Sequence, residues 1–414
     1  MCRALRTGLF LAIAVSGLSQ AGVVSSHGAL KVQGTHIVDA YGKPIQIAGM
    51  SLYWSVWGGE AFFTSGVVKT MANDFSSSLI RAPAGVISGT GANVYNYPGT
   101  ENLVKTVVEA AIANDIYVLV DWHLESGDPA LDQAKQFFND MTTKYKNTPN
   151  IIWEIWNEPK GVNWGVIKNY ANTMIPLIRQ NSSNLIVVGT PNWSHNPDQA
   201  SADPITIDDN VAYTFHFYAD QNSNGTIDAD NNSAMNAVNK AIQKVPLFIT
   251  EWGTVGNSGS GTVNTTWSDK WLDWAKTNGV SWANWSLCDK TESSAALKGG
   301  ASSNGGWNAG NLSTSGTYVF GKIKEVTARI TTGVAEPTRQ DLPFSARRTS
   351  QGISLDLPQG SRSLAIFDLQ GREVYQQNLT IHGAFQIPSP GTGALVLRVE
   401  TTSGTKVAKV APAP

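Results

Sequence analysis

The sequence predicts an α/β fold: a closed (β/α)8 TIM barrel followed by a small C-terminal β-sandwich. Eight short apolar runs alternate with longer segments of helical period between residues 45 and 330. The runs are continuously apolar, which is typical of parallel strands covered on both faces. Eight strand-then-helix units in one chain of this length fit a closed barrel better than an open sheet. After residue 343, short alternating segments are separated by turn residues, which favours a β-sandwich.

The predicted elements follow one another in strict alternation. Strands are expected at 45–52, 79–83, 116–123, 151–158, 185–190, 211–218, 247–252 and 281–287. Helices are expected near 66–75, 101–114, 130–146, 164–180, 233–244, 265–278 and 316–330. The fifth unit departs from the rule, because 191–210 resembles a loop. Residues 30–48 alternate around a turn at 39–44 and predict a β-hairpin before the barrel.

The two ends of the chain carry their own signals. Residues 1–21 predict a secretory signal peptide, with Arg3 and Arg6 before an apolar run and Ala21 at a small-residue cleavage site. A membrane anchor is the alternative, but the run is too short to span a bilayer. We therefore expect a secreted protein, extracellular or attached to the cell surface. Its only remaining cysteine would be Cys288, so no internal disulfide is expected.

The remaining chain divides into a catalytic barrel at 28–331, a linker at 332–343 rich in turn residues, and a β-module at 344–414. The module has no tryptophan, which argues against a ligand-binding face of aromatic platforms. Its short segments at 366–374 and 406–409 resemble C-terminal sorting modules of surface-exporting, fibre-digesting bacteria. A plain stabilising module is the alternative.

The composition limits the classes of partner that are expected. Charged residues make up 15% of the chain and the net charge is −2, so neither a nucleic acid nor an anionic membrane surface is expected as a partner. All 14 tryptophans lie between Trp54 and Trp307. Sugar rings stack on such flat apolar faces, so a neutral polysaccharide fits the composition. We expect the protein to act as a monomer.

Polar residues close almost every predicted strand. Barrel enzymes carry their catalytic groups at these C-terminal strand ends. Such residues are costly to bury unless they face a shared cavity. They are Arg81, His123, Asn157, Glu158, His216, Tyr218, Glu251 and Trp285.

Glu158 and Glu251 end the fourth and seventh strands, which stand across the barrel from one another. Retaining glycoside hydrolysis requires two carboxyl groups about 5 Å apart on either side of the scissile bond. Arg81 and Tyr218 would keep Glu251 ionised as the nucleophile. Glu158 would then be the general acid and base. Each glutamate taken alone has a simpler explanation, a salt bridge or a helix cap.

The neighbouring polar residues have supporting roles in this hypothesis. The Asn157 amide would hold the sugar hydroxyl next to the reacting carbon. His123 and His216 would orient the pair, although either histidine could be a structural hydrogen-bonding residue. A His–His–carboxylate metal site is conceivable, but the paired ligand spacing of known metal motifs is absent. We expect neither a metal nor a cofactor.

Two segments resemble a known family. Residues 152–159 (IWEIWNEP) are similar to the acid/base motif of glycoside hydrolase family 5, and 249–253 (ITEWG) to its nucleophile motif. Arg81, His123, His216 and Trp285 match further family positions in the same chain order. The resemblance covers roughly residues 30–331 and implies a retaining (β/α)8 enzyme.

Within the family, residues 284–297 (NWSLCDKTESSAAL) resemble the eighth-strand segment of bacterial endo-β-1,4-glucanases. The resemblance implies that Trp285 stacks on the sugar beside the cleaved bond, and that Lys290 and Glu292 bind the next glucose. Trp57 and Trp193 resemble stacking surfaces on the non-reducing and reducing sides. The alternatives are a solvated ion pair for Lys290 and Glu292, and core packing for the two tryptophans.

The leading hypothesis is therefore a retaining endo-β-1,4-glucanase, a cellulase, acting on cellulose and related β-glucans. The same mechanism on mannan, xylan, lichenan or xyloglucan is the nearest alternative. A non-catalytic carbohydrate-binding barrel is an alternative of another class. Residues 220–231 imitate a calcium loop, but position twelve is Asn231 instead of glutamate, so asparagine-rich turns explain the pattern equally well.

Overall fold

A computed structural model of the chain describes residues 22–87, 93, 95–97, 100, 102–222, 226–332 and, towards the C-terminus, 346–349, 352–357, 361–368, 372–379, 383–391, 393, 395–401 and 404–410. The signal segment at 1–21 lies outside the described residues, as does nearly all of the predicted linker. None of the helices in these ranges is both long and apolar enough to cross a membrane.

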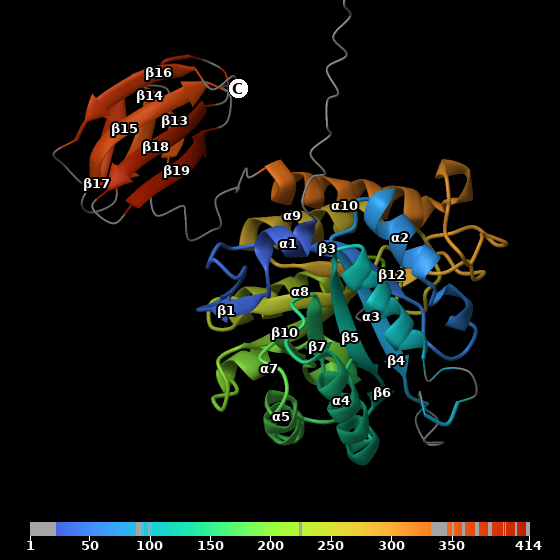
Figure 1. The fold of residues 1–414 in the computed structure, drawn as a ribbon. Coiled ribbons are helices and arrows are strands. Elements are labelled where there is room, and N and C mark those ends of the chain that lie inside the picture. Colours follow the sequence, from blue (N-terminus) through green and yellow to red (C-terminus); the bar gives the residue numbers. More distant parts are fainter. Residues whose placement is uncertain are drawn as a thin grey trace, which may run out of the picture.

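Eight parallel strands close into a barrel, with the helices on its outside (Figure 1), as predicted. In barrel order the strands are β3 (Ala48–Leu52), β4 (Leu79–Gly85), β5 (Tyr117–His123), β7 (Ile151–Glu154), β9 (Ile186–Val188), β10 (Val211–Tyr218), β11 (Leu247–Gly253) and β12 (Trp282–Leu287). Every residue in these strands is buried. Continuous burial is the physical reason that the strands are mostly apolar on both faces instead of alternating, apart from the polar residues towards their C-terminal ends.

The helices bury one apolar stripe each against the strands. They are α2 (Ser65–Asn73), α3 (Leu103–Ala113), α4 (Leu131–Tyr145), α5 (Trp164–Arg179), α8 (Ile227–Ala241), α9 (Thr265–Asn278) and α10 (Thr314–Thr332). Several begin at side-chain caps: Thr64, Asn163 and Asn264 each accept a bond from the backbone N–H three residues on. Short 3-10 turns η1 (Glu60–Phe62) and η2 (Ala309–Asn311) lie in the loops.

Two local predictions are wrong and a third is incomplete. Residues 191–210 are not all loop, because the short helix α7 (Pro197–Ala202) forms there with proline at its first position, whereas α6 (Pro191–Ser194) is a tight turn with left-handed backbone at Asn192 and Trp193. The predicted reversal at 39–44 is present, with Val38 bridged antiparallel to Pro44, but β1 (Lys31–Gln33) and β2 (His36–Val38) form a further hairpin that turns at Gly34. The fourth strand ends at Glu154, and a separate ribbon pairs β6 (Glu125–Ser126) with β8 (Glu158–Pro159) beyond the barrel rim.

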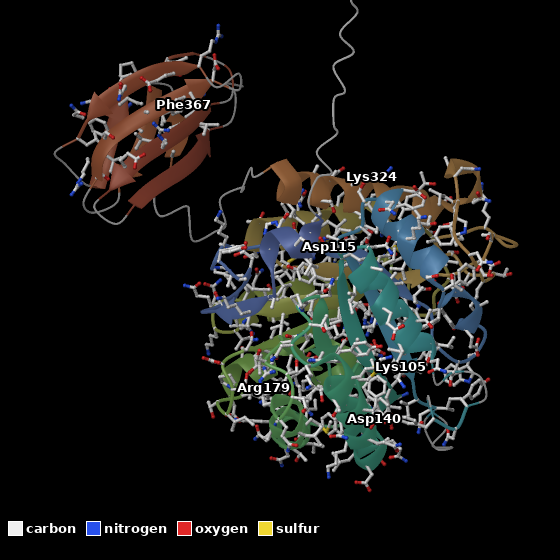
Figure 2. All side chains as sticks on the ribbon, viewed as in Figure 1. Lys105, Asp115, Asp140, Arg179, Lys324 and Phe367 are labelled. Carbon is white, nitrogen blue, oxygen red and sulfur yellow. The ribbon has the colours of Figure 1, made fainter. Side chains whose placement is uncertain are left out.

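The first residues that the structure describes pack beneath the barrel, at the N-terminal ends of the strands. Val24 of α1 (Val23–His27), Leu30, Ile37 and Ile47 form one apolar cluster with strand-start residues such as Leu79. The backbone N–H of Ser25 donates to Asp115, which lies beside α1 (Figure 2). Arg329 of α10 donates to Gln46 at 2.7 Å. This face is therefore closed by both ends of the barrel domain.

The C-terminal region holds two antiparallel sheets. One contains β13 (Ala346–Thr349), β14 (Gly352–Leu357) and β17 (Gly383–Ile387); the other contains β15 (Ser361–Asp368), β16 (Glu373–Asn378), β18 (Leu395–Thr401) and β19 (Gly404–Val410). Apolar residues of both sheets, including Leu355 and Leu397, share one core cluster. This arrangement is the expected β-sandwich.

Candidate active site

The two predicted carboxylates meet at the C-terminal mouth of the barrel. One ligand atom each of Glu158, His216 and Glu251 lie within 4.8 Å of one another. The side chain of Glu251 is 5% exposed and that of Glu158 is 13% exposed, so both are nearly enclosed but reach solvent. The separation matches that of retaining glycosidases and falls short of the 6.5–9.5 Å, roughly, of inverting ones.

Glu251 is held on both oxygens. Arg81 Nη1 donates to its Oε2 at 2.8 Å and the Tyr218 hydroxyl donates to its Oε1 at 2.5 Å. Both donors are buried, and hydrogen bonds to a carboxylate favour its charged form. Gly253 makes room for this contact: a Cβ there would lie 2.3 Å from a ring carbon of Tyr218. This explains the glycine in the ITEWG segment.

Arg81 is the centre of a buried charge network. Its Nε donates to Glu154 at 2.8 Å, and its Nη2 contacts Asp121 at 2.9 Å and Asn157 Oδ1 at 2.6 Å. Burial alone would lower the pKa of Arg81, but the surrounding carboxylates raise it above its ordinary value. Arginine only donates, so it fixes the Asn157 oxygen towards itself and leaves the amide nitrogen for a substrate hydroxyl.

Glu158 has a different environment. Its Oε1 pairs with His216 Nδ1 at 2.9 Å, and His216 Nε2 pairs with the Thr250 hydroxyl at 2.9 Å. Burial, and then the nearby carboxylate of Glu125, raise the pKa of Glu158 to about 8. Burial lowers the pKa of His216 to about 4, so its imidazole is neutral at pH 7. Glu158 is therefore protonated at neutral pH.

His123 lies between the charge network and the aromatic residues of the cleft. Its Nδ1 pairs with Asp121 Oδ2 at 2.5 Å, and burial lowers its pKa to about 3. The Trp285 ring stacks on His123 at 5.2 Å with an interplanar angle of 6°. The centre of the Tyr53 ring also lies 5.2 Å from the centre of the Trp285 ring. These contacts fix the tilt of the Trp285 indole.

Two residues of the network received no role from the sequence, Asp121 and Glu154. Burial raises the pKa of both carboxyls, to about 7 for Asp121, while Arg81 opposes the shift. Asp121 and His123 are two residues apart on one strand and thus face the same way. The sequence signal that could have found Asp121 is an acidic residue two positions before the histidine that ends the strand.

The remaining predicted residues line the rim. Trp57 is 47% exposed and packs against Trp54 at 4.7 Å, so it is not a core residue. Lys290 Nζ donates to the Trp57 carbonyl at 3.1 Å and lies 4.3 Å above the Tyr53 ring. Burial raises the pKa of the half-buried Glu292, which also contacts Cys288 Sγ at 4.0 Å. Lys290 and Glu292 are therefore each held by neighbouring residues of the rim.

Trp193 lies on the opposite rim, near Glu158. Residues 192–194 all have positive φ, and the Trp193 indole nitrogen donates to Glu125 at 2.7 Å. Trp193 is partly exposed, so it too is available to a ligand.

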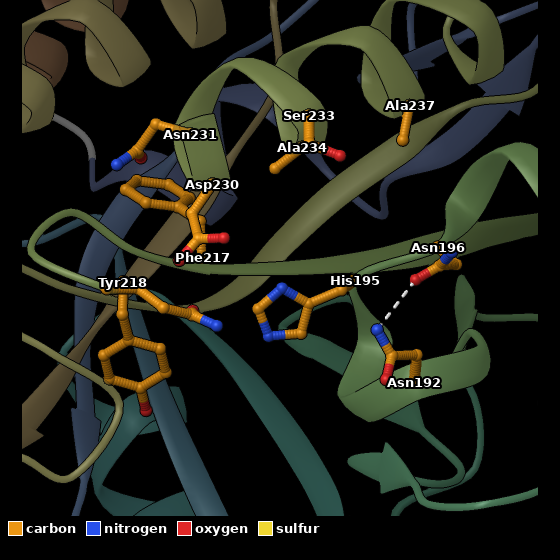
Figure 3. A pocket seen from close by; sticks show the side chains of 11 residues that line it. Asn192, His195, Asn196, Phe217, Tyr218, Asp230, Asn231, Ser233, Ala234 and Ala237 are labelled. Atoms are coloured by element: carbon orange, nitrogen blue, oxygen red, sulfur yellow. Dashed lines mark hydrogen bonds between the residues drawn. The ribbon is translucent and has the colours of Figure 1, made fainter. Parts of the chain in front are cut away.

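A cavity of about 200 Å³ lies next to this turn (Figure 3). His195 and Asp230 face it, and Tyr218 forms one wall, but neither Glu158 nor Glu251 lines it. It therefore adjoins the carboxylate pair without containing it. The predicted calcium-like segment ends beside this cavity; Asp228 and Asn231 accept bonds from Trp267 and Trp271 at 2.7 Å each. Residues 223–225 of that segment are outside the described part of the chain.

The Glu158–His216–Glu251 cluster also has spacing that suits a cation. Arg81, however, places a permanent positive charge 2.8 Å from Glu251, and the second Glu251 oxygen already accepts from Tyr218. Like charges at this distance repel strongly in a buried site. The donor set therefore fits two catalytic carboxyls better than a metal ion.

Comparison with known proteins agrees with this geometry. The family model for cellulase (glycosyl hydrolase family 5) matches residues 38–291. The chain is 44% identical over 297 residues to Endoglucanase Z of Dickeya dadantii (strain 3937), covering 70% of this chain and 67% of the relative. It is 39% identical over 308 residues to an Endoglucanase of Clostridium saccharobutylicum, covering 73% and 66%.

Solved structures of cellulase domains also resemble this chain. The catalytic domain of Thermobifida fusca endoglucanase Cel5A has a TM-score of 0.67 at 31% identity, covering 73% of this chain and 100% of that domain. A structure from Cytophaga hutchinsonii has a TM-score of 0.69 at 34% identity, covering 76% and 100%. From the matched family model and from these identities, the chain belongs to glycosyl hydrolase family 5, the cellulase family.

Proposed function

We propose that this protein is a retaining endo-β-1,4-glucanase that cuts internal bonds of cellulose and related β-glucans. The observation that carries the proposal is the pair of carboxyls, within 4.8 Å of one another, of which Glu251 accepts from a guanidinium and a hydroxyl while Glu158 pairs with a neutral imidazole. Relatives named endoglucanase, and a variant of the Thermobifida fusca domain solved with cellotetraose, support a glucan as substrate.

In the first step, the Glu251 carboxylate attacks the anomeric carbon while Glu158 gives its proton to the leaving oxygen. The leaving chain departs as an alcohol, and a covalent glycosyl-enzyme remains. In the second step, Glu158 takes a proton from water, whose oxygen attacks the same carbon and releases Glu251. Two inversions give net retention.

The residues around the pair support the charge changes. Arg81 and Tyr218 stabilise Glu251 when it leaves as a carboxylate. The neutral His216 pairs with Glu158 in both of its states, accepting from the acid in one tautomer and donating to the carboxylate in the other. The Thr250 hydroxyl bonded to His216 both donates and accepts, so it accommodates either tautomer.

The first experiment compares substrates. Reducing-sugar release should be high on carboxymethyl cellulose and low on mannan and xylan, and proton NMR of early products should show the β-anomer first. Activity on mannan alone would overturn the assignment of Lys290 and Glu292 to glucose. Absence of hydrolysis on every β-glycan would favour the non-catalytic carbohydrate-binding barrel.

The basic, apolar and small-residue order of residues 1–21 supports the further proposal that the protein is exported and cleaved after Ala21. Expression of the full chain in a secreting bacterium, followed by mass measurement of the released protein, tests the cleavage site. A retained, uncleaved chain in the membrane fraction would instead support an anchor. Gel filtration of the secreted form tests the expected monomer, and deletion of 344–414 tests whether that module directs sorting.

A further inference from the structure

The ribbon beyond the barrel rim places a third carboxylate beside the catalytic acid. β6 and β8 are parallel, with Glu125 directly opposite Glu158 in the register, and the Glu158 N–H donates to the Leu124 carbonyl at 3.1 Å. The backbone that carries the acid is thus fixed to the backbone that carries Glu125. Side chains at paired positions on neighbouring strands lie close enough to interact.

Glu125 also anchors the indole on the leaving side of the cleft. Its Oε1 accepts from Trp193 Nε1 at 2.7 Å and from Lys160 Nζ at 3.2 Å, and Lys160 lies 5.2 Å from the centre of the Trp193 ring. The turn that presents Trp193 has φ values of 58°, 56° and 59° at residues 192–194. Three consecutive non-glycine residues in the left-handed region are costly and need tertiary contacts to hold them.

We propose that Glu125 is a positioning residue that links the leaving-side indole to the acid: one carboxylate holds Trp193 in place and supplies the negative charge that faces Glu158. The inference rests on the proposed glucanase function. The carboxylate is 40% exposed, so water screens it in the free enzyme. A sugar stacked on Trp193 would displace that water and strengthen the interaction between the two acids.

The direction of the effect follows from charge. A negative charge beside Glu158 favours its protonated form, in agreement with the contribution of Glu125 to its raised pKa. Glu158 has to be protonated when the leaving chain departs. Glu125 therefore extends the active range towards higher pH, and Lys160 limits that extension by neutralising part of its charge.

The test is the pH profiles of kcat/KM and of kcat on cellopentaose for Glu125→Gln and Lys160→Met, because the first reports the free enzyme and the second the substrate complex. Glutamine keeps an oxygen for the Trp193 N–H but removes the charge, so the basic limb should move down by roughly 0.3–0.8 pH units at low salt. Lys160→Met should move it up. Both shifts should shrink in 1 M salt, roughly as screening predicts.

Glu109→Gln is the matched control. Glu109 also accepts from a lysine and from an aromatic side chain, Lys144 at 2.6 Å and Tyr145 at 3.2 Å, but it belongs to α3 on the outside of the barrel. Its profile should coincide with that of the unmodified enzyme. Thermal unfolding of each variant establishes that the folded state is kept.

A second arm tests the anchoring of the indole. Glu125→Leu removes both the charge and the acceptor, and should raise KM on cellopentaose several-fold more than Glu125→Gln does. It should leave KM unchanged on an aryl cellobioside, whose small leaving group does not need Trp193. If the basic limb of the pH profile does not move in Glu125→Gln although the variant folds normally, the inference is overturned and the glucanase function remains. Lack of activity in the unmodified enzyme would instead refute the function itself.

Discussion

The two sides of the barrel mouth use the same residue type for opposite purposes. At the end of β11, Glu251 accepts from a buried guanidinium and a buried hydroxyl. At the end of the β6–β8 ribbon, Glu158 faces a neutral imidazole and another carboxylate, Glu125. One environment stabilises negative charge and the other stabilises a bound proton. In the proposed mechanism, position in the fold, not residue identity, therefore decides which glutamate attacks and which donates.

The largest expected effect is on the charged side. Glu251→Gln should reduce kcat by about 10⁴-fold or more, because no carboxylate remains to form the glycosyl-enzyme. Binding of cellotetraose should persist, since glutamine retains the shape and an acceptor for Tyr218. Trapping of the unmodified enzyme with a 2-fluoro cellobioside and peptide mapping should find the label on Glu251. A label on any other residue would contradict the comparison.

The next effect is on the protonated side. Glu158→Ala should slow hydrolysis of cellulosic substrates by roughly 10²–10⁴-fold, because the leaving oxygen receives no proton. An aryl cellobioside with an acidic phenol leaving group needs little protonation, so its first step should be almost unaffected. Pre-steady-state bursts on that substrate measure the step directly. Equal losses on both substrates would argue that Glu158 is not the acid.

A smaller effect should follow from Tyr218→Phe, which removes one of the two bonds to Glu251. A hydrogen bond to a charged group contributes about 1.5–3 kcal/mol, equivalent to a loss in kcat of roughly 10–100-fold. Tyr213→Phe is the control on the same strand, because that hydroxyl accepts from the Ile205 N–H at 2.8 Å, away from the carboxylates. It should lower the melting temperature and leave kcat unchanged. The reverse pattern would place the Tyr218 hydroxyl in a structural role.

The mildest test is pH. Glu158 must carry a proton in the free enzyme, and its pKa is about 8, so kcat/KM should fall tenfold per unit only above about pH 8. His216, with its pKa near 4, stays neutral over this range and contributes no basic limb. Stopped assays from pH 5 to 10 give the profile. A basic limb that survives in Glu158→Ala on an activated substrate would assign it to another group.

The sequence predicts the barrel well because each strand is apolar on both faces and each helix has a single apolar stripe. Residues 211–218, for example, are predicted and found as one strand, β10. Deviations occur where local turn chemistry decides. The hairpin turns at Gly34 because glycine adopts φ of 63° there without cost, while 39–44 forms its own turn around Asp39, whose side chain accepts from Tyr41 and Lys43.

The site is only partly readable from sequence, for a physical reason. Strand ends reveal which residues approach the mouth, so Arg81, Glu158 and Glu251 were foreseeable. Whether a given carboxylate bonds to Arg81 or faces the cleft depends on the direction of its side chain inside the closed barrel. Glu154 shares a strand with its neighbours in the IWEIWNEP segment but turns to Arg81. Glu125 gives no signal, because its importance comes from a two-residue ribbon that no periodicity predicts.

The apolar cluster at the N-terminal ends of the barrel strands has a practical consequence. Val24, Leu30 and Ile37 pack against the opposite ends of the strands from the carboxylates, and α10 is tied to the same face through Arg329 and Gln46. This packing therefore lies at the opposite end of the barrel from the carboxylates, as expected where one end of a barrel carries the active site and the other contributes stability. Substitutions that aim at a higher melting temperature can therefore be placed at this end of the barrel, where they should leave the active site unchanged. Examples are larger aliphatic side chains, or a crosslink between α1 and the loop that holds Asp115.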